Sequence, residues 1–215
     1  QVRNVSLLTR YISGASFSVP GAGKTSEALA FYLLTRKAEE KLLIVAPNNA
    51  FVAWEDELKA CLPALNKKIK RLMGGANRVV NLLSDDPDMV IISYHQLPGV
   101  IESVNAYIRR NAVCMMVDES HRMKRGNEGV HGASILNLSF LPCRKLILSG
   151  TPMPNSSTDL VSQLRFLFPE VRTEAETVIE DFQPFFVRTT KAELQLPPVM
   201  RKRVNVEMSE AQRIL

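Results

Sequence analysis

The residues of this chain that are best suited to chemistry form a glycine-rich loop. Gly21-Ala22-Gly23-Lys24-Thr25 stands between Pro20 and Ser26. Glycines let backbone N–H groups approach phosphate oxygens, and the N-terminus of a following helix adds positive potential. In this pattern Lys24 reaches the β- and γ-phosphates, and the Thr25 hydroxyl is a ligand for Mg²⁺. The loop therefore predicts a nucleoside triphosphate site, with a glycine turn that merely caps a helix as the plainer alternative.

A second set of chemical residues, Val117-Asp118-Glu119-Ser120-His121, follows an apolar run. Adjacent carboxylates repel each other, so they are costly unless a cation or an activated water occupies them. We assign Asp118, with Thr25, to the Mg²⁺ shell and Glu119 to the general base that polarises the attacking water. Lys24, Asp118, Glu119 and His121 form the predicted catalytic set. The alternative is an acidic helix cap, which the upstream phosphate loop disfavours.

A third element, Leu146–Thr151, is a buried strand that ends in small hydroxyl residues. Ser149 and Thr151 are predicted to contact the acidic segment and to sense the γ-phosphate, and His121 is predicted to make contacts toward this strand. Taken alone, the segment is equally well explained as an ordinary strand followed by a turn. The phosphate loop also departs from the full pattern, because Ser18 stands where that pattern has a glycine.

The elements that must position these residues alternate along the chain. Near-continuous apolar runs predict buried strands, and 3.6-residue periodicity predicts the helices between them. This alternation indicates an α/β fold with a central, mostly parallel sheet and helices on both faces, and ligands bind such sheets at the carboxyl ends of the strands. The expected strands are Ser16–Val19, Leu42–Ala46, Ile69–Met73, Met89–Ser93, Val113–Val117 and Lys145–Ser149, and the expected helices are Thr25–Glu39, Ala50–Leu62, Gln96–Arg110, Gly132–Leu138 and Glu174–Phe182.

Composition bounds the class of protein. The chain has 215 residues, of which 46% are apolar, enough for a packed domain of this length. No apolar run approaches the ~20 residues of a membrane helix, so no membrane partner is expected. The three cysteines have no metal-site spacing and are interpreted as reduced core residues. A net charge of +5 is compatible with a polyanionic partner without requiring one.

In their order along the chain, these elements resemble the first RecA-like lobe of superfamily-two helicases. More narrowly, they resemble the Swi/Snf-type DNA translocases. The likeness covers nearly the whole chain and depends on the order of its motifs. Besides the phosphate loop, these are Leu43–Pro47 with Val52–Glu57, Val90–His95, Val117–His121, Leu148–Asn155, Phe185–Lys191 with Leu196-Pro197-Pro198, and Met208–Gln212.

The resemblance implies a RecA-like P-loop NTPase lobe that uses ATP and Mg²⁺. Residues 1–183 are expected to form the N-terminal ATP-binding lobe, and residues 184–215 an exit linker and the start of a second lobe. Gln1 stands where such proteins carry a glutamine that reads the adenine edge. In the family the second lobe supplies an arginine finger, which contributes ~10³–10⁵ in rate. The fragment by itself is therefore expected to bind ATP weakly and to hydrolyse it poorly or not at all.

The same resemblance places nucleic-acid contacts in loops that follow strands. Short polar side chains suit phosphate oxygens and carry no information about base sequence. The basic residues Arg122, Lys124 and Arg125 follow the acidic segment directly, and Trp54 is interpreted as a packing anchor in preference to a base-stacking residue. The predicted contacts are Pro47, Asn48, Asn49, Ser93, Tyr94, His95, Arg122, Lys124 and Arg125.

The leading hypothesis is the motor lobe of an ATP-dependent translocase on double-stranded DNA. The alternatives are a strand-separating DNA or RNA helicase lobe, with single-stranded DNA or RNA as its partner, and a non-catalytic nucleic-acid-binding scaffold. Intact Lys24, Thr25, Asp118 and Glu119 argue against the scaffold. The expected location is the cytoplasm in a prokaryote and the nucleus in a eukaryote.

Overall fold

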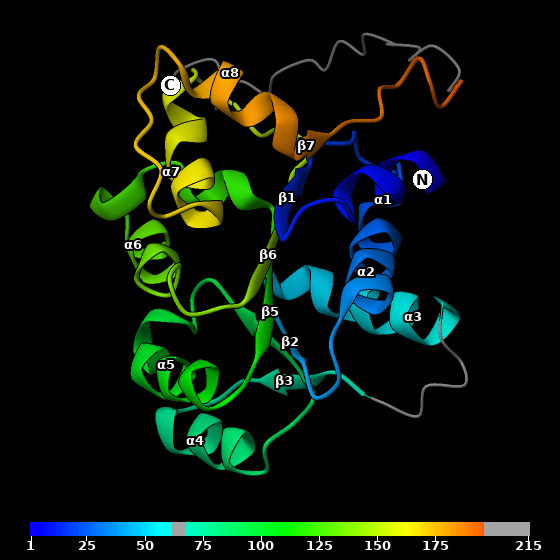
Figure 1. Cartoon of the computed structure of the whole chain (residues 1–215). Coiled ribbons are helices and arrows are strands. Elements are labelled where there is room, and N and C mark those ends of the chain that lie inside the picture. The colour runs from blue at the N-terminus through cyan, green and yellow to red at the C-terminus, as the bar shows by residue number, and fades with distance from the viewer. Residues whose placement is uncertain (62–67, 196–215) are drawn as a thin grey trace, which may run out of the picture.

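The computed structural model describes residues 1–61 and 68–195 (Figure 1). Its centre is a seven-stranded sheet with the order β3-β4-β2-β5-β6-β1-β7, in which each pair of neighbours is parallel. The strands are β1 (Ser13–Ser16), β2 (Lys41–Ala46), β3 (Lys70–Leu72), β4 (Met89–Ser93), β5 (Val113–Asp118), β6 (Arg144–Leu148) and β7 (Phe186–Val187).

Helices cover both faces of this sheet, which Figure 1 shows nearly edge-on. One face carries α1 (Val2–Leu8), α2 (Lys24–Thr35) and α3 (Phe51–Cys61). The opposite face carries α4 (Ala76–Ser84), α5 (Ile101–Arg110), α6 (Val130–Asn137) and α7 (Thr158–Leu167), and α8 (Val178–Phe182) packs beside α7. Short 3-10 turns link them: η1 (Asn48–Ala50), η2 (Pro98–Val100), η3 (Ser120–Met123), η4 (Gly126–Glu128) and η5 (Gln183–Phe185).

The core has two halves because successive strand residues point to opposite faces. Leu42 and Ile44 of β2 pack with Trp54 in the cluster beneath α2 and α3. Leu43 and Val45 of the same strand pack into the cluster beneath α4 to α7. A strand that is buried on both faces is apolar throughout, which is why the central strands could be recognised in the sequence. The predicted α/β class is confirmed.

The first strand was placed wrongly. The sequence favoured Ser16–Val19, whereas β1 spans Ser13–Ser16. Its residues are small and fully packed, and a Cβ on Gly14 would lie 3.1 Å from both Leu8 and a backbone carbonyl. Close packing selects small residues here, so the strand lacks the bulky β-branched signal that marks its neighbours.

Some helices also differ from expectation. α2 ends at Thr35 rather than Glu39, because Arg36 is already extended and the chain turns back toward β2. α5 begins only at Ile101, after the η2 turn that contains Pro98, since proline lacks the N–H that a helix interior requires. The expected helix at Glu174–Phe182 is confined to α8. Helices α1, α4 and α7 were not anticipated.

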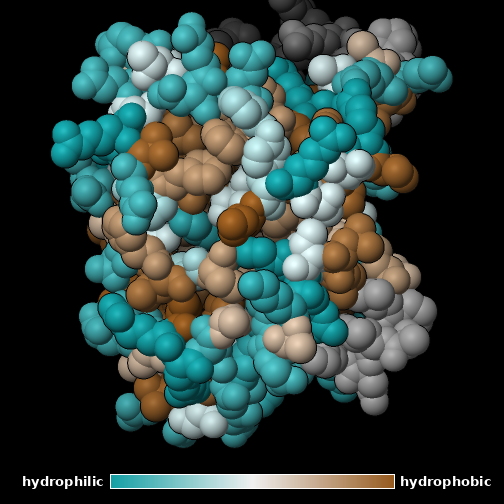
Figure 2. Space-filling model, viewed as in Figure 1, coloured by the Kyte–Doolittle hydropathy of each residue, from teal (hydrophilic) through white to brown (hydrophobic). Residues whose placement is uncertain are grey.

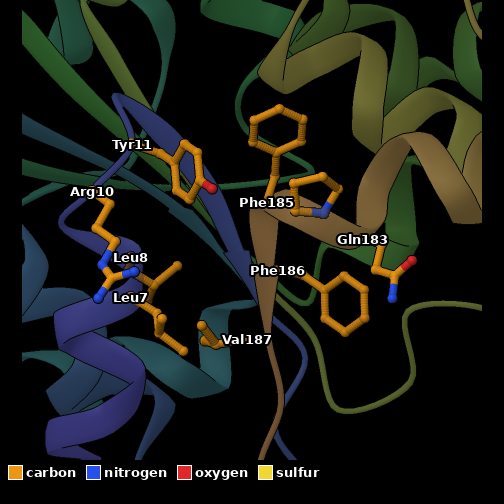
Figure 3. Close-up of a pocket in the computed structure, with 9 residues that line it drawn as sticks. Leu7, Leu8, Arg10, Tyr11, Gln183, Phe185, Phe186 and Val187 are labelled. Carbon is orange, nitrogen blue, oxygen red and sulfur yellow. The ribbon is translucent and has the colours of Figure 1, made fainter.

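The last strand extends the sheet beyond residue 183. Phe186 and Val187 of β7 pair with β1, so the segment expected to be exit linker begins inside the fold. Figure 3 shows the hollow that this segment lines together with the end of α1, where the rings of Tyr11 and Phe185 meet edge to face at 5.2 Å between centroids. The domain division remains a proposal, with β7 added to the lobe. Its proposed continuation, residues 196–215, lies outside the described residues.

The face of the molecule in Figure 2 is largely hydrophilic, and its apolar residues lie in several separate groups. Exposed apolar side chains include Leu34, Val130 and Phe140, which belong to different parts of the fold. Within residues 1–61 and 68–195, no helix has the length and apolar character needed to cross a membrane.

Candidate nucleotide-binding site

The glycine loop joins β1 to α2 at the carboxyl edge of the sheet. Gly21 and Gly23 have φ values of 80° and 81°, a left-handed conformation that glycine adopts without strain. Gly23 is the N-cap of α2, so the loop ends on the unpaired N–H groups of a twelve-residue helix. The Lys24 ammonium donates a hydrogen bond to the Val19 carbonyl at 3.3 Å. This geometry suits phosphate binding by backbone N–H groups and one lysine.

Gln1 lies directly over this loop. Its side-chain amide donates to the Ala22 carbonyl at 3.3 Å, and a Cβ on Gly23 would stand only 1.8 Å from the Gln1 nitrogen. A side chain at position 23 would therefore displace the Gln1 amide, in addition to straining the backbone. The sequence placed Gln1 and the loop in one nucleotide site, and the fold brings them into contact, although the adenine role of Gln1 stays a prediction.

Ser18 belongs to a buried polar cluster that links the loop to the exit segment. The Ser18 hydroxyl accepts a hydrogen bond from the Thr189 backbone N–H at 3.0 Å. Asn4 of α1 donates to Thr189 Oγ1 at 2.9 Å and to the Glu27 carboxylate at 2.8 Å, and Ser16 donates to the other Glu27 oxygen at 2.7 Å. A serine at position 18 thus contributes a hydroxyl that glycine lacks. The sequence did not reveal Asn4 or Glu27, because their partners are distant in the chain.

The acidic segment begins at the end of β5, and Asp118 is held by two donors. Oδ1 accepts from the Glu119 N–H at 2.9 Å, and Oδ2 accepts from the Trp54 indole N–H at 3.0 Å. Burial raises the pKa of Asp118, while the Trp54 hydrogen bond and the charge of Lys24 act in the opposite direction. β1 and β5 are parallel with only β6 between them, so the loop and the acidic segment lie at the same carboxyl edge of the sheet.

Glu119 occupies an unusual backbone conformation. Its φ of 53° and ψ of 49° lie in the left-handed region, where a non-glycine residue stores strain of order 1–3 kcal/mol. The Tyr94 hydroxyl donates to the carbonyls of both Asp118 and Glu119, which holds the turn. The hydrogen bond with His121 lowers the pKa of Glu119, with a smaller contribution from the Lys24 charge. Glu119 is therefore ionised at neutral pH, as a general base must be.

His121 connects the acidic segment to the third element, as the sequence predicted. Its Nδ1 lies 3.3 Å from Glu119 Oε2 and 3.0 Å from Ser149 Oγ. Ser149 in turn accepts from the Thr151 backbone N–H at 3.1 Å, while the Thr151 side chain is exposed. β6, which ends just before Ser149, lies between β5 and β1 in the sheet. The third element therefore stands between the acidic segment and the phosphate loop.

A buried amide adds a second connection that the sequence did not suggest. Gln163 of α7 is fully buried and accepts from the Ser120 hydroxyl at 2.6 Å. Its nitrogen donates to the Pro152 carbonyl at 2.7 Å and to the Asp159 carbonyl at 2.9 Å. Gln163 thus joins the acidic segment to the loop after β6. Its position in a helix that was not anticipated left no local signal.

The donor set suits Mg²⁺, which prefers hard oxygen ligands and usually takes one or two protein groups together with substrate phosphates and water. The Asp118 carboxylate and the Thr25 hydroxyl would hold the ion. Among the residues that the structure describes, no cluster of three or more His, Cys, Asp or Glu could hold a metal without such help. When bound, Mg²⁺ would neutralise developing charge on the phosphates.

The predicted nucleic-acid residues divide by exposure. The loops after β2, β4 and β5 are neighbours, since β4 and β5 flank β2 and Ala46 is the register partner of Ser93. Asn48, Asn49, His95, Arg122 and Arg125 are exposed, whereas Pro47 and Lys124 are half-buried. Ser93 and Tyr94 are 5% and 1% exposed. These two side chains cannot reach a backbone phosphate in this structure, so we withdraw them as contacts. Tyr94 instead stabilises the acidic segment through the hydrogen bonds of its hydroxyl to the Asp118 and Glu119 carbonyls.

Fold and site define the chain as a RecA-like P-loop NTPase lobe. The SNF2-related domain family matches residues 13–183, and the chain belongs to this family. The predicted resemblance to Swi/Snf-type proteins is thereby confirmed.

The chain is similar to two remodeling ATPases of Saccharomyces cerevisiae. It is 27% identical over 239 residues to the ISWI chromatin-remodeling complex ATPase ISW1, covering 97% of this chain and 20% of that protein. It is also 27% identical over 237 residues to the ISWI chromatin-remodeling complex ATPase ISW2, again covering 97% of this chain and 20% of that protein. The chain thus spans about a fifth of the length of these relatives.

A solved structure is also similar in fold. The SWI2/SNF2 ATPase core of Sulfolobus solfataricus in complex with dsDNA superposes with a TM-score of 0.71 at 18% identity, over 91% of this chain and 44% of that one. At this identity the likeness supports the RecA-like fold, and the chemistry rests on the residues described above.

Proposed function

We propose that this chain is the N-terminal ATP-binding lobe of an ATP-dependent translocase on double-stranded DNA. The observation that carries the proposal is the facing pair of elements at one edge of the sheet: the glycine loop with Lys24, and Asp118 with Glu119. In support, the Saccharomyces relatives are ATPases of chromatin-remodeling complexes, and the Sulfolobus core is bound to dsDNA.

In this proposal each residue of the chain has a separable task. The loop N–H groups and Lys24 bind and orient the phosphates. Glu119 accepts a proton from the attacking water, and His121 holds its carboxylate in place at 3.3 Å. Ser149 contacts His121. In this position it would respond to the presence or absence of the γ-phosphate and transmit that change to the loop after β6.

The second half of the site is proposed to come from a second RecA-like lobe in the same full-length chain. Hydrolysis would then alternate the closure of the two lobes and move the protein along a strand. Exposed Asn48, Asn49, His95, Arg122 and Arg125 would contact backbone phosphates, with binding that weakens steeply as salt rises. In a eukaryote we expect the protein in the nucleus.

The test is an ATPase assay of the protein with both lobes, in the presence of duplex DNA, single-stranded DNA or RNA. We expect every nucleic acid that binds to stimulate ATP hydrolysis, with the strongest stimulation by duplex DNA. No stimulation by any nucleic acid would refute the motor function. A strand-displacement assay then separates the translocase from the helicase, because efficient unwinding would favour a strand-separating enzyme.

A further inference from the structure

Trp54 is the single tryptophan of the chain, and its indole is fully buried on α3. This confirms that it is a packing anchor, but packing does not account for its polar atom. A buried indole N–H needs a hydrogen-bond acceptor. The acceptor here is Oδ2 of Asp118 at 3.0 Å, the carboxylate that we assign to Mg²⁺.

The hydrogen bond orients Asp118 without consuming its capacity as a ligand. Each carboxylate oxygen can accept about two hydrogen bonds or metal contacts. Oδ1 accepts from the Glu119 N–H and Oδ2 from Trp54, so each oxygen receives one of these donors and both retain capacity. One donor comes from the neighbouring backbone and the other from a different helix. Together they restrict the rotation of the carboxylate about its side-chain bonds.

The helix that carries Trp54 is itself fixed on two sides. Glu57 accepts a hydrogen bond from Ser26 in the first turn of α2, which follows the phosphate loop. Glu55 accepts two hydrogen bonds from Arg71 of β3, at 2.6 and 2.7 Å. The indole N–H therefore points at Asp118 from a helix, α3, that is hydrogen-bonded both to the start of α2 beside the phosphate loop and to the edge strand β3.

We propose that Trp54 is a positioning residue that orients Asp118 for Mg²⁺ in the nucleotide complex. The inference rests on the proposed ATP site. It assigns control of the Mg²⁺ affinity to Trp54, a side chain that is not itself a metal ligand. Groups that orient a metal ligand through a hydrogen bond typically change metal affinity or activity 10–100-fold when they are replaced.

The first test uses the protein with both lobes and measures ADP binding by calorimetry in Mg²⁺ and in EDTA. The ratio of the two Kd values is then compared between variants. Trp54→Phe retains an aromatic ring but has no N–H, and we expect it to reduce the Mg²⁺-dependent tightening about 10-fold with the EDTA value unchanged. Phe51→Leu is the matched control, because Phe51 is a buried neighbour on α3 in the same core cluster. It should lower thermal stability without changing the ratio.

The outcomes separate the two proposals. If the wild-type protein with both lobes binds ADP in neither condition, the ATP site itself is refuted. If Mg²⁺ tightens ADP binding equally in the wild type and in Trp54→Phe, only the role of Trp54 is refuted. The same holds if Phe51→Leu reduces the ratio as much as Trp54→Phe does, since lost packing would then explain both.

A second test needs no variant, so it decides the question even if Trp54→Phe does not fold. As the chain has one tryptophan, its fluorescence reports on the surroundings of this one indole, which include the hydrogen bond to Asp118. We expect the emission of the ADP complex to shift when Mg²⁺ is added and to return with EDTA. An emission that stays constant while Mg²⁺ tightens ADP binding would overturn the proposal.

Discussion

The two edges of the central sheet both carry buried or half-buried charges, but they use them differently. At the amino edge, Arg144 at the start of β6 donates two hydrogen bonds to Glu40 at 2.9 and 2.6 Å, and Lys41 at the start of β2 pairs with Asp86. At the carboxyl edge, Asp118 is oriented by neutral donors. The charges of these two pairs at the amino edge are neutralised within the chain.

The difference separates stability from function. A charge that is paired inside the fold contributes to the folded state when both partners are present, and its loss is felt as unfolding. Within residues 1–61 and 68–195, the hydrogen-bond donors to the Asp118 carboxylate are neutral, while burial raises its pKa and the charge of Lys24 acts in the opposite direction. That arrangement favours binding of a cation. Substitutions at the carboxyl edge should therefore change nucleotide binding or turnover, and substitutions at the amino edge should change the free energy of unfolding.

Glu119→Gln should give the largest effect and should act on turnover only. Without a general base, we expect DNA-stimulated ATP hydrolysis by the two-lobed protein to fall ~10²–10⁴-fold. ATP binding should persist, because the loop and Asp118 are unchanged. Parallel ATPase and nucleotide-binding measurements check this. Loss of binding would mean that Glu119 holds the nucleotide instead of activating water.

Arg144→Met should act on stability only. It leaves the Glu40 carboxylate, whose side chain is 1% exposed, buried without its cation. We expect a loss of about 3–5 kcal/mol in denaturant unfolding. Replacing both partners with apolar residues should recover most of it. The comparison between the edges breaks if nucleotide affinity of the folded Arg144→Met variant falls as well.

Gln163→Leu tests the connection between the acidic segment and the loop after β6. It leaves the Ser120 hydroxyl and the Pro152 carbonyl without their partner, at an expected cost of about 1–3 kcal/mol in unfolding free energy. Adding Ser120→Ala removes one unpaired group, so the double variant should be more stable than the sum of the single effects. Additive effects in a double-mutant cycle would show that the two residues are not coupled.

Lys145 is expected to act only at alkaline pH, through the pH dependence of stability. Burial lowers its pKa to about 8, and its ammonium donates to the Ser139 carbonyl at 2.8 Å. Between this value and the unfolded pKa of about 10.4, the unfolded state binds more protons. The contribution of Lys145 to stability should therefore rise with pH across that window and stay flat below it. Lys145→Met should remove this slope; an unchanged slope would assign it to other groups.

Much of the fold could be predicted because its central strands are buried on both faces. β2, β4, β5 and β6 were recognised to within a residue or two, since burial on two sides forces continuous apolar runs. β1 and β7 were misplaced or missed. β1 is built of small residues that close packing demands, and β7 has only two residues, so neither leaves a periodic pattern.

The chemistry of the site was determined by the sequence itself. Gly21, Gly23, Lys24, Asp118 and Glu119 are recognisable because backbone freedom, charge and short spacing are local properties of the chain. The tertiary structure decided what supports them. The Trp54 indole reaches Asp118 across 64 residues of the chain, the Gln163 amide reaches Ser120 across 43, and Asn4 reaches Glu27 across 23. Such hydrogen bonds form only when the sheet brings the carboxyl ends of its strands together, so no local pattern announces them.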